Sequence, residues 1–176
     1  MKGLEEKRRK ARIAIALDVL ANVDSLRVSN AGWYIADVPD GSRDENDCRK
    51  FNGDWKADAR RYLKRLQKCQ VCALGACMIS HVKLFDKVKM GDLKIDADPL
   101  YKNKLVSDRG DSILGRFFDQ DQIDKIETAF EAGTKNARPV GYDAEEFGRR
   151  YDEPKRRLKA IMANIIVNDG EFKPGE

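Results

Sequence analysis

An apolar stretch rich in cysteine constrains the fold of this chain more than any other feature. It runs from Cys69 to Phe85 and holds three of the four cysteines and the only histidine of the sequence. Alanine, leucine, valine, isoleucine and methionine fill most positions between them, so apolar side chains cover every side of a helical projection. Because a helix that is apolar all round is a buried one, the stretch predicts a central core helix.

The same residues allow a second interpretation as a zinc site. Cys69, Cys72, Cys77 and His81 have the spacing C-x2-C-x4-C-x3-H, and thiolate with imidazole is a ligand set that suits zinc. On a continuous helix, however, the first and last of them lie about 18 Å apart along the axis, so one ion cannot reach all four. Zinc therefore requires a loop here, and the apolar spacers are not typical of one. We expect a buried helix without a cofactor and keep zinc as the alternative.

Cysteine chemistry of other kinds finds little support in the sequence. Cys77 and His81 stand four residues apart on a helix and could touch, but no third group is evident that would orient the imidazole. The pair Cys69 and Cys72 follows basic helical sequence, whereas a redox C-x2-C normally opens a helix after a strand. Neither glycine-rich nucleotide-binding motif occurs. We expect a protein that is not an enzyme and has no catalytic residues.

In the first half of the chain, helical patterns surround one strand candidate. Residues 4–23 repeat apolar side chains at helical spacing, and residues 33–38 have the aromatic and β-branched character of a short strand. A helical stretch from about residue 54 to 87 is first amphipathic and then buried. Either a break near Gln67 or a kink at Gly75 would divide it.

The second half predicts further helices with clear start signals. Residues 111–118 suit a short helix, and Asp119 with Gln122 forms a capping box ahead of a helix that ends at Gly133. Pro154 suits the first turn of a final helix. That helix carries one apolar stripe, made of Leu158, Ile161, Met162, Ile165 and Ile166.

These patterns predict one mainly α-helical domain over residues 1–176, with the buried helix at its centre and at most a small β-hairpin or short strands. The 41% hydrophobic residues can supply one core. Loops are expected at about 39–53, 89–108 and 134–143, where glycine, proline and charged residues interrupt the periodic pattern. No repeat or linker divides the chain.

Charge is abundant and nearly balanced, with 34 basic and 30 acidic residues. The basic residues gather in three stretches, around residues 7–12, 60–68 and 149–159. Each stretch is either the solvated face of an amphipathic helix or part of an anion-binding surface. The residues predicted to contact a partner or nucleic acid are Arg60, Arg61, Lys64, Arg65, Arg156 and Arg157, together with the aromatic pair Trp33 and Tyr34.

Cysteine content and hydropathy indicate the compartment. Four cysteines without a secretory signal predict a reducing, cytoplasmic setting, and no apolar run approaches the roughly 20 residues of a membrane helix. We expect a soluble protein with no membrane partner.

Cys69-Gln-Val-Cys72-Ala-Leu-Gly-Ala, the Phe117 to Glu131 segment and the closing Met162 to Gly170 segment resemble small uncharacterised proteins encoded by phages and prophages. The resemblance covers about residues 60–170 and its motifs are packing motifs. It implies no known activity and no functional residues. What it implies is an accessory protein that binds and inhibits or modulates a host macromolecule. A protein is the expected partner, and a basic-surface regulator of nucleic acid is the alternative.

Overall fold

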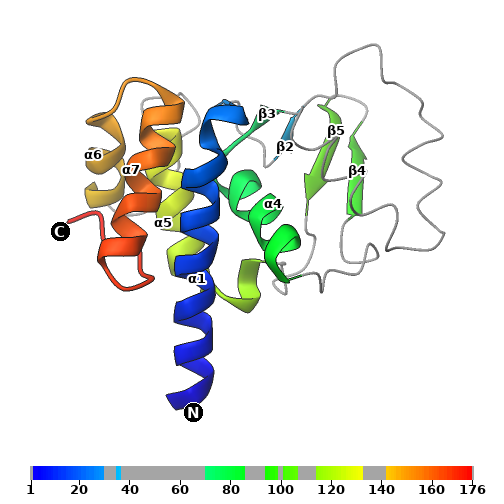
Figure 1. Cartoon of the computed structure of the whole chain (residues 1–176). Helices are drawn as coiled ribbons and strands as arrows, with labels where there is room; N and C mark the ends of the chain where they lie inside the picture. The colour runs from blue at the N-terminus through cyan, green and yellow to red at the C-terminus, as the bar shows by residue number, and fades with distance from the viewer. Residues whose placement is uncertain are drawn as a thin grey trace.

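The fold of the described residues is mainly α-helical, as the sequence predicts. We analysed a computed structural model, which describes residues 2–29, 35–36, 70–85, 94–98, 101–106, 114–132 and 142–175. Five α-helices lie in these ranges (Figure 1). They are α1 (Lys2–Asn22), α4 (Ala73–Phe85), α5 (Gln120–Glu131), α6 (Tyr142–Arg149) and α7 (Pro154–Val167), with short 3-10 turns η1 (Val23–Ser25) and η4 (Leu114–Arg116).

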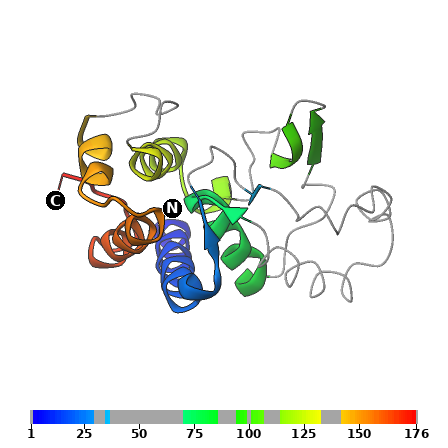
Figure 2. The ribbon, with the colours of Figure 1, turned by 90° about the horizontal axis from the view of Figure 1, so that it is seen from above.

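Helix α4 is the central helix of the core, which confirms the main expectation from the cysteine segment. Every residue from Val71 to His81 is buried. Helices α1 and α5 and the turn η4 contact α4, and α7 reaches it where the Cys77 thiol lies 3.9 Å from the Met162 sulfur. Helix α1 also runs beside α7, as seen from above in Figure 2. Only the last turn of α4 reaches the surface, at Lys83 and Leu84.

Two small sheets accompany the helices. Strand β3 (Gln70–Val71) lies between β1 (Arg27–Val28), which is parallel to it, and β2 (Ile35–Ala36), which is antiparallel. Strand β2 lies inside the strand expected at residues 33–38. Strands β4 (Lys94–Asp98) and β5 (Tyr101–Val106) form an antiparallel hairpin. The hairpin lies within residues 89–108, where we expected a loop with at most a short strand, and it is longer than that expectation.

Of the helix expected from residue 54 to 87, the described part begins with the strand β3 and not with helix; residues 54–69 lie outside the described residues. The β-branched Val71 pairs with β1 and its carbonyl accepts a 3.0 Å hydrogen bond from the Ser29 N–H, so the backbone is extended there. Cys72 then caps α4, because its sulfur accepts a hydrogen bond of 3.4 Å from the Gly75 N–H. The boundary lies closer to the cysteines than the predicted break near Gln67, which is outside the described residues.

The C-terminal helices follow their sequence signals closely. Pro154 occupies the first turn of α7, and the stripe residues Leu158, Ile161, Met162 and Ile165 are fully buried. The Asp119 carboxylate accepts a 2.8 Å hydrogen bond from the Gln122 N–H at the start of α5. The return bond of a capping box is absent from the described hydrogen bonds, since the Gln122 amide bonds Phe172 instead.

Helix α6 starts inside the loop expected at residues 134–143. It packs against α5 at Gly148, where an added Cβ would lie 1.9 Å from the Ala129 carbonyl oxygen. Glycine therefore allows the two backbones to approach. Helix α6 has only eight residues, so a sequence pattern gives little signal for it.

Candidate functional site

The two described cysteines are structural rather than reactive. Cys72 and Cys77 are free thiols in the core, and burial raises the pKa of each to about 12. A thiol is a nucleophile or a metal ligand only as the thiolate. Both thiols therefore stay protonated near neutral pH.

His81 is enclosed by aromatic rings. It is 1% exposed, and its ring centroid lies 5.5 Å from that of Phe85 and 5.0 Å from that of Phe117. Burial lowers its pKa to about 4, with a smaller contribution from the positive charge of Arg116. Neither ring nitrogen has a hydrogen-bond partner within the described structure. His81 is therefore neutral, and it does not form with Cys77 the hydrogen bond that a nucleophile and its base require.

The zinc alternative rests on four residues, of which Cys69 lies outside the described residues. The other three are Cys72 before α4 and Cys77 and His81 within it. Among the residues that the structure describes, no group of three or more His, Cys, Asp or Glu side chains is placed to hold a metal ion.

The predicted contact residue Arg157 is buried, which corrects its placement on the surface. It is 5% exposed. Its guanidinium donates hydrogen bonds to the carbonyl oxygens of Phe130 at 2.6 Å, Gly148 at 3.1 Å and Tyr151 at 2.9 Å. Arg157 thus ties α5, α6 and α7 together, because its planar fork of donors reaches carbonyls at the ends of α5 and α6.

Arg156 is the only one of the predicted contact residues that the described structure places on the surface. Its guanidinium lies 3.6 Å from the Glu153 carboxylate. The remaining predicted contacts lie outside the described residues. They are Trp33, Tyr34, Arg60, Arg61, Lys64 and Arg65.

Most other basic side chains of the described surface are paired with carboxylates. The partners lie one helical turn away or on a neighbouring helix, so positive charge is neutralised locally. These pairs are Lys83 with Asp18, Lys125 with Asp121, Arg149 with Glu145, Arg150 with Glu146, and Lys159 with Asp24.

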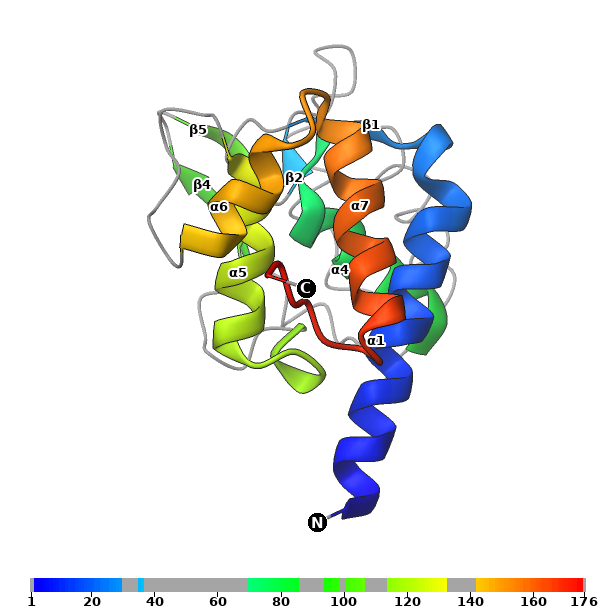
Figure 3. The same cartoon turned by 90° about the vertical axis from the view of Figure 1, so that its left-hand side faces the viewer.

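The N-terminal turns of α1 differ from this surface because they extend beyond the other helices (Figures 1 and 3). Among the described hydrogen bonds and ion pairs, the first that join α1 to another element are made by Arg9, which pairs with Asp169, and by Arg12, which donates to the Phe117 carbonyl oxygen at 2.8 Å. Residues 3–8, which precede these contacts, are called the projecting end below. Its Leu4 is 62% exposed.

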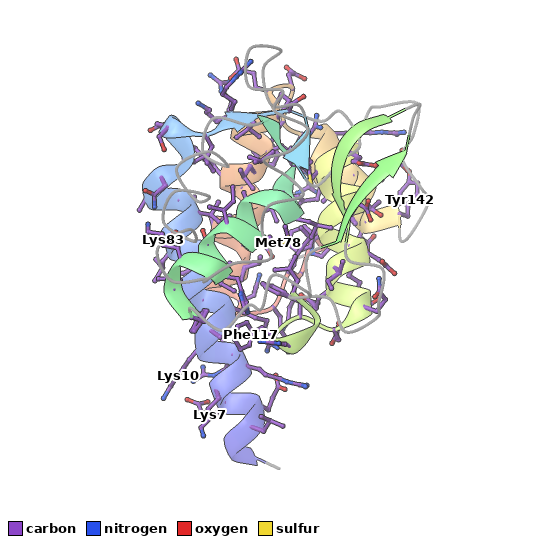
Figure 4. The ribbon with its side chains drawn as sticks, turned by 90° about the vertical axis from the view of Figure 1, so that its right-hand side faces the viewer. Lys7, Lys10, Met78, Lys83, Phe117 and Tyr142 are labelled. Atoms are coloured by element: carbon purple, nitrogen blue, oxygen red, sulfur yellow. The ribbon has the colours of Figure 1, made fainter. Side chains whose placement is uncertain are left out.

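Lys7 and Arg8 supply unpaired positive charge to the projecting end. Neither lies within ion-pair distance of a carboxylate of the described residues, whereas Glu5 pairs with Arg12 and Glu6 with Arg9 and Lys10. Hydrogen bonds from those two cations lower the pKa of Glu6 to about 2, so the carboxylate stays ionised. Figure 4 shows Lys7 and Lys10 on this part of α1, away from the hairpin β4–β5.

Two buried amide side chains are functional candidates that the sequence analysis missed. Gln122 of α5 and Asn164 of α7 both hydrogen-bond the backbone that follows α7. Sequence alone places Gln122 in a cap and Asn164 beside an apolar stripe. A contact between residues 50 positions apart gives no local signal.

Comparison with known proteins finds no match to this chain among protein-family models, curated proteins or solved structures. Among the described helices, none combines the length and the apolar character needed to cross a membrane.

Proposed function

We propose that this chain is a non-enzymatic binding protein that docks the projecting end of α1 onto an acidic surface of a partner protein. The observation that carries the proposal is a helical end that extends past the body with exposed Leu4 and with Lys7 and Arg8, two cations that have no ion pair with a described residue.

The projecting end is pre-formed, which favours binding. Glu5 and Glu6 lie near the positive end of the helix dipole and pair with cations three, four and seven residues further along. An isolated short helix is marginal in water, but this one continues from a segment anchored at Arg9 and Arg12. A partner would therefore lose little free energy in ordering it.

The chemistry of the projecting end suits a protein surface. Protein–protein interfaces commonly have an apolar centre and a polar rim, and one exposed leucine surrounded by charged side chains has the same arrangement on a small scale. The cations would steer an acidic partner, with an association rate that depends on salt. Cys77 and His81 are buried in the core, which favours a binding function over cysteine–histidine catalysis.

The resemblance to phage-encoded proteins would make the partner a bacterial host macromolecule, inhibited or modulated in the cytoplasm. Trp33, Tyr34 and the basic residues at 60, 61, 64 and 65 stay in the proposal as further contacts.

The proposal can be tested by capture from a nuclease-treated bacterial extract, followed by binding measurements with the purified partner. The test variant is Lys7→Gln/Arg8→Gln. The matched control is Lys125→Gln/Arg149→Gln, which removes two exposed cations already paired with carboxylates. We expect the test variant to lose at least about tenfold in affinity, since two charge contacts are worth of that order. The control should bind like the wild type.

Equal binding by both variants would remove the projecting end from the proposal. A parallel capture from untreated extract tests the alternative: if the chain retains nucleic acid there, and nuclease abolishes all retention, the nucleic-acid alternative replaces the proposal. Phosphate contacts would then also show as a steep fall of affinity with salt.

A further inference from the structure

The segment after α7 folds back along the helices in an extended conformation (Figure 3). Helix α7 ends at Val167, and the chain reverses through Asp169 and Gly170, whose φ angles are 57° and 91°. The Gly170 N–H donates a 2.7 Å hydrogen bond to the Ile165 carbonyl oxygen and closes the turn. Residues 171–175 then leave the helix and run toward α6, where Gly175 approaches Asp143.

Two side-chain amides hold this segment by its backbone. The Phe172 N–H donates to Gln122 Oε1 at 2.6 Å, and Gln122 Nε2 donates to the Phe172 carbonyl oxygen at 3.3 Å. The Lys173 N–H donates to Asn164 Oδ1 at 2.7 Å, and Asn164 Nδ2 donates to the Lys173 carbonyl oxygen at 2.9 Å. All four polar backbone groups of two consecutive residues are thereby satisfied by side chains.

Phe172 makes the aromatic contact of this segment. Phe172 is 1% exposed and meets Phe147 of α6 edge to face, with ring centroids 5.2 Å apart. The next residue, Lys173, is half-buried and its amine lies 4.0 Å from the Glu171 carboxylate. Pro174 is buried and has no N–H, so the backbone requires no further donor partner there.

This pattern is the one by which proteins bind extended peptides. Hydrogen bonds to the main chain supply affinity for any sequence, and an aromatic contact for one side chain supplies specificity. We propose that Gln122, Phe147 and Asn164 form a recognition site for an extended peptide with a phenylalanine, and that residues 171–173 are its resident intramolecular ligand. The partner is a protein segment of that chemistry, which replaces the resident.

Replacement requires little rearrangement of the fold. The stripe that holds α7 in the core ends with the fully buried Ile165 and the partly buried Ile166, before the turn, so the segment can leave by rotations at residues 168–170 while α7 stays packed. Tethering gives the resident an effective concentration on the order of millimolar. A peptide in trans therefore competes poorly until the resident is weakened, which makes the site a regulated one. This inference does not depend on the projecting end of α1.

The test weakens the resident in the full-length chain and supplies the ligand separately. Phe172→Ala removes the aromatic contact, and the probe is a fluorescent peptide with the sequence of residues 169–175, Asp-Gly-Glu-Phe-Lys-Pro-Gly. We expect the variant to bind the probe at least about tenfold more tightly than the wild type, because the competing resident is weaker. A probe carrying the same Phe172→Ala change should not bind.

A second substitution in the Phe172→Ala chain locates the site. Gln122→Leu should lower the affinity for the probe at least about tenfold, because the peptide backbone loses both partners. Gln120→Leu is the matched control, since Gln120 is exposed on the same helix and donates only to Asp124 among the described contacts. It should leave binding unchanged. A folded Phe172→Ala chain that does not bind the probe overturns the proposal.

If Phe172→Ala does not fold, a cut chain replaces it. A protease site inserted between Asn168 and Glu171 allows the wild-type segment to be cleaved after folding, with every contact of Phe172 and Lys173 in place. Exchange of the cut segment for the fluorescent probe supports the proposal. A cut segment that never exchanges, or a chain that unfolds on cleavage and is not restored by excess peptide, shows a fixed part of the core and overturns it.

Discussion

Glycine and arginine occur both in the projecting end of α1 and where α5, α6 and α7 meet, and their surroundings differ. Gly3 has no atom within 4 Å of the place where a Cβ would stand, whereas at Gly148 that place lies 1.9 Å from a backbone oxygen. Arg8 has no ion pair within the described residues, whereas Arg157 donates to three carbonyls. The same residue type therefore serves packing in one region and is available to a partner in the other.

The largest effect is expected from Gly148→Ala. The new methyl group would meet the Ala129 carbonyl oxygen and also Ala132 Cβ at 2.5 Å, and a backbone atom cannot turn aside as a side chain can. We expect a loss of at least about 4 kcal/mol of stability or a failure to fold, since overpacking at a backbone contact forces two helices apart. Urea denaturation followed by circular dichroism measures it.

Gly3→Ala is the matched change in the projecting end. It should stabilise α1 by up to about 0.5–1 kcal/mol, because alanine has the higher helix propensity and nothing stands in its way. If Gly3→Ala and Gly148→Ala lowered the free energy of unfolding equally, the contrast between the two regions would be wrong, because the projecting end would then be packed against other residues.

Arg157→Gln is the next largest. Gln cannot reach all three carbonyls. The Phe130 carbonyl oxygen would lose its 2.6 Å bond from the guanidinium, and the Gly148 oxygen would keep only the 3.2 Å bond from the Tyr151 N–H. We expect a loss of about 3 to 4 kcal/mol, the range for breaking a buried charge-assisted network. Arg8→Gln should change stability by less than about 0.5 kcal/mol, because Arg8 is only partly buried and has no ion pair with a described residue. If urea denaturation showed a similar loss of stability for Arg157→Gln and Arg8→Gln, the two arginines would not differ in the way the structure indicates.

Sequence patterns predict the helices with long apolar stripes and fail where the decisive contact is distant in the chain. The buried α4 and the stripe of α7 follow from residues 71–81 and 158–165 alone, because burial of a periodic face is a local signal. Arg157 stands among basic residues and appears exposed in sequence. Its burial is possible because α5 and α6 pack beside it in the fold and supply the carbonyl oxygens that accept its hydrogen bonds.

The candidate sites follow the same division. Lys7 and Arg8 of the projecting end belong to the basic stretch 7–12 that sequence identifies, although sequence does not show which cations of that stretch are paired. In sequence, Gln122 and Asn164 look like ordinary helix residues. Their amides gain a role only because the backbone of residues 172–173 folds back and hydrogen-bonds to them. A hydrogen bond between elements so far apart depends on the turn at Asp169 and Gly170, whose left-handed backbone only the structure reveals.

The smallest of the three effects is a pH dependence that belongs to the core and not to the projecting end. The folded-state pKa of His81, about 4, lies below the ordinary value of 6.5, so protonation favours the unfolded chain. The free energy of unfolding should have its full value above about pH 6.5 and fall as the pH decreases toward 4. Once His81 is protonated in the folded state as well, it should be lower by about 3 kcal/mol.

His81→Phe keeps a ring between Phe85 and Phe117 and removes the titration. Because the chain has one histidine, the difference between the urea-unfolding free energies of the variant and the wild type isolates this residue from the carboxylates. That difference should grow steadily from pH 6.5 to 4. Glu6→Gln in the projecting end should leave the wild-type slope between pH 6.5 and about 5 unchanged, since the ordinary pKa of glutamate, 4.5, lies below that range and solvent screens the pairs of Glu6. A flat difference for His81→Phe would mean that water reaches the imidazole, and the aromatic enclosure of His81 would then be no part of the sealed core.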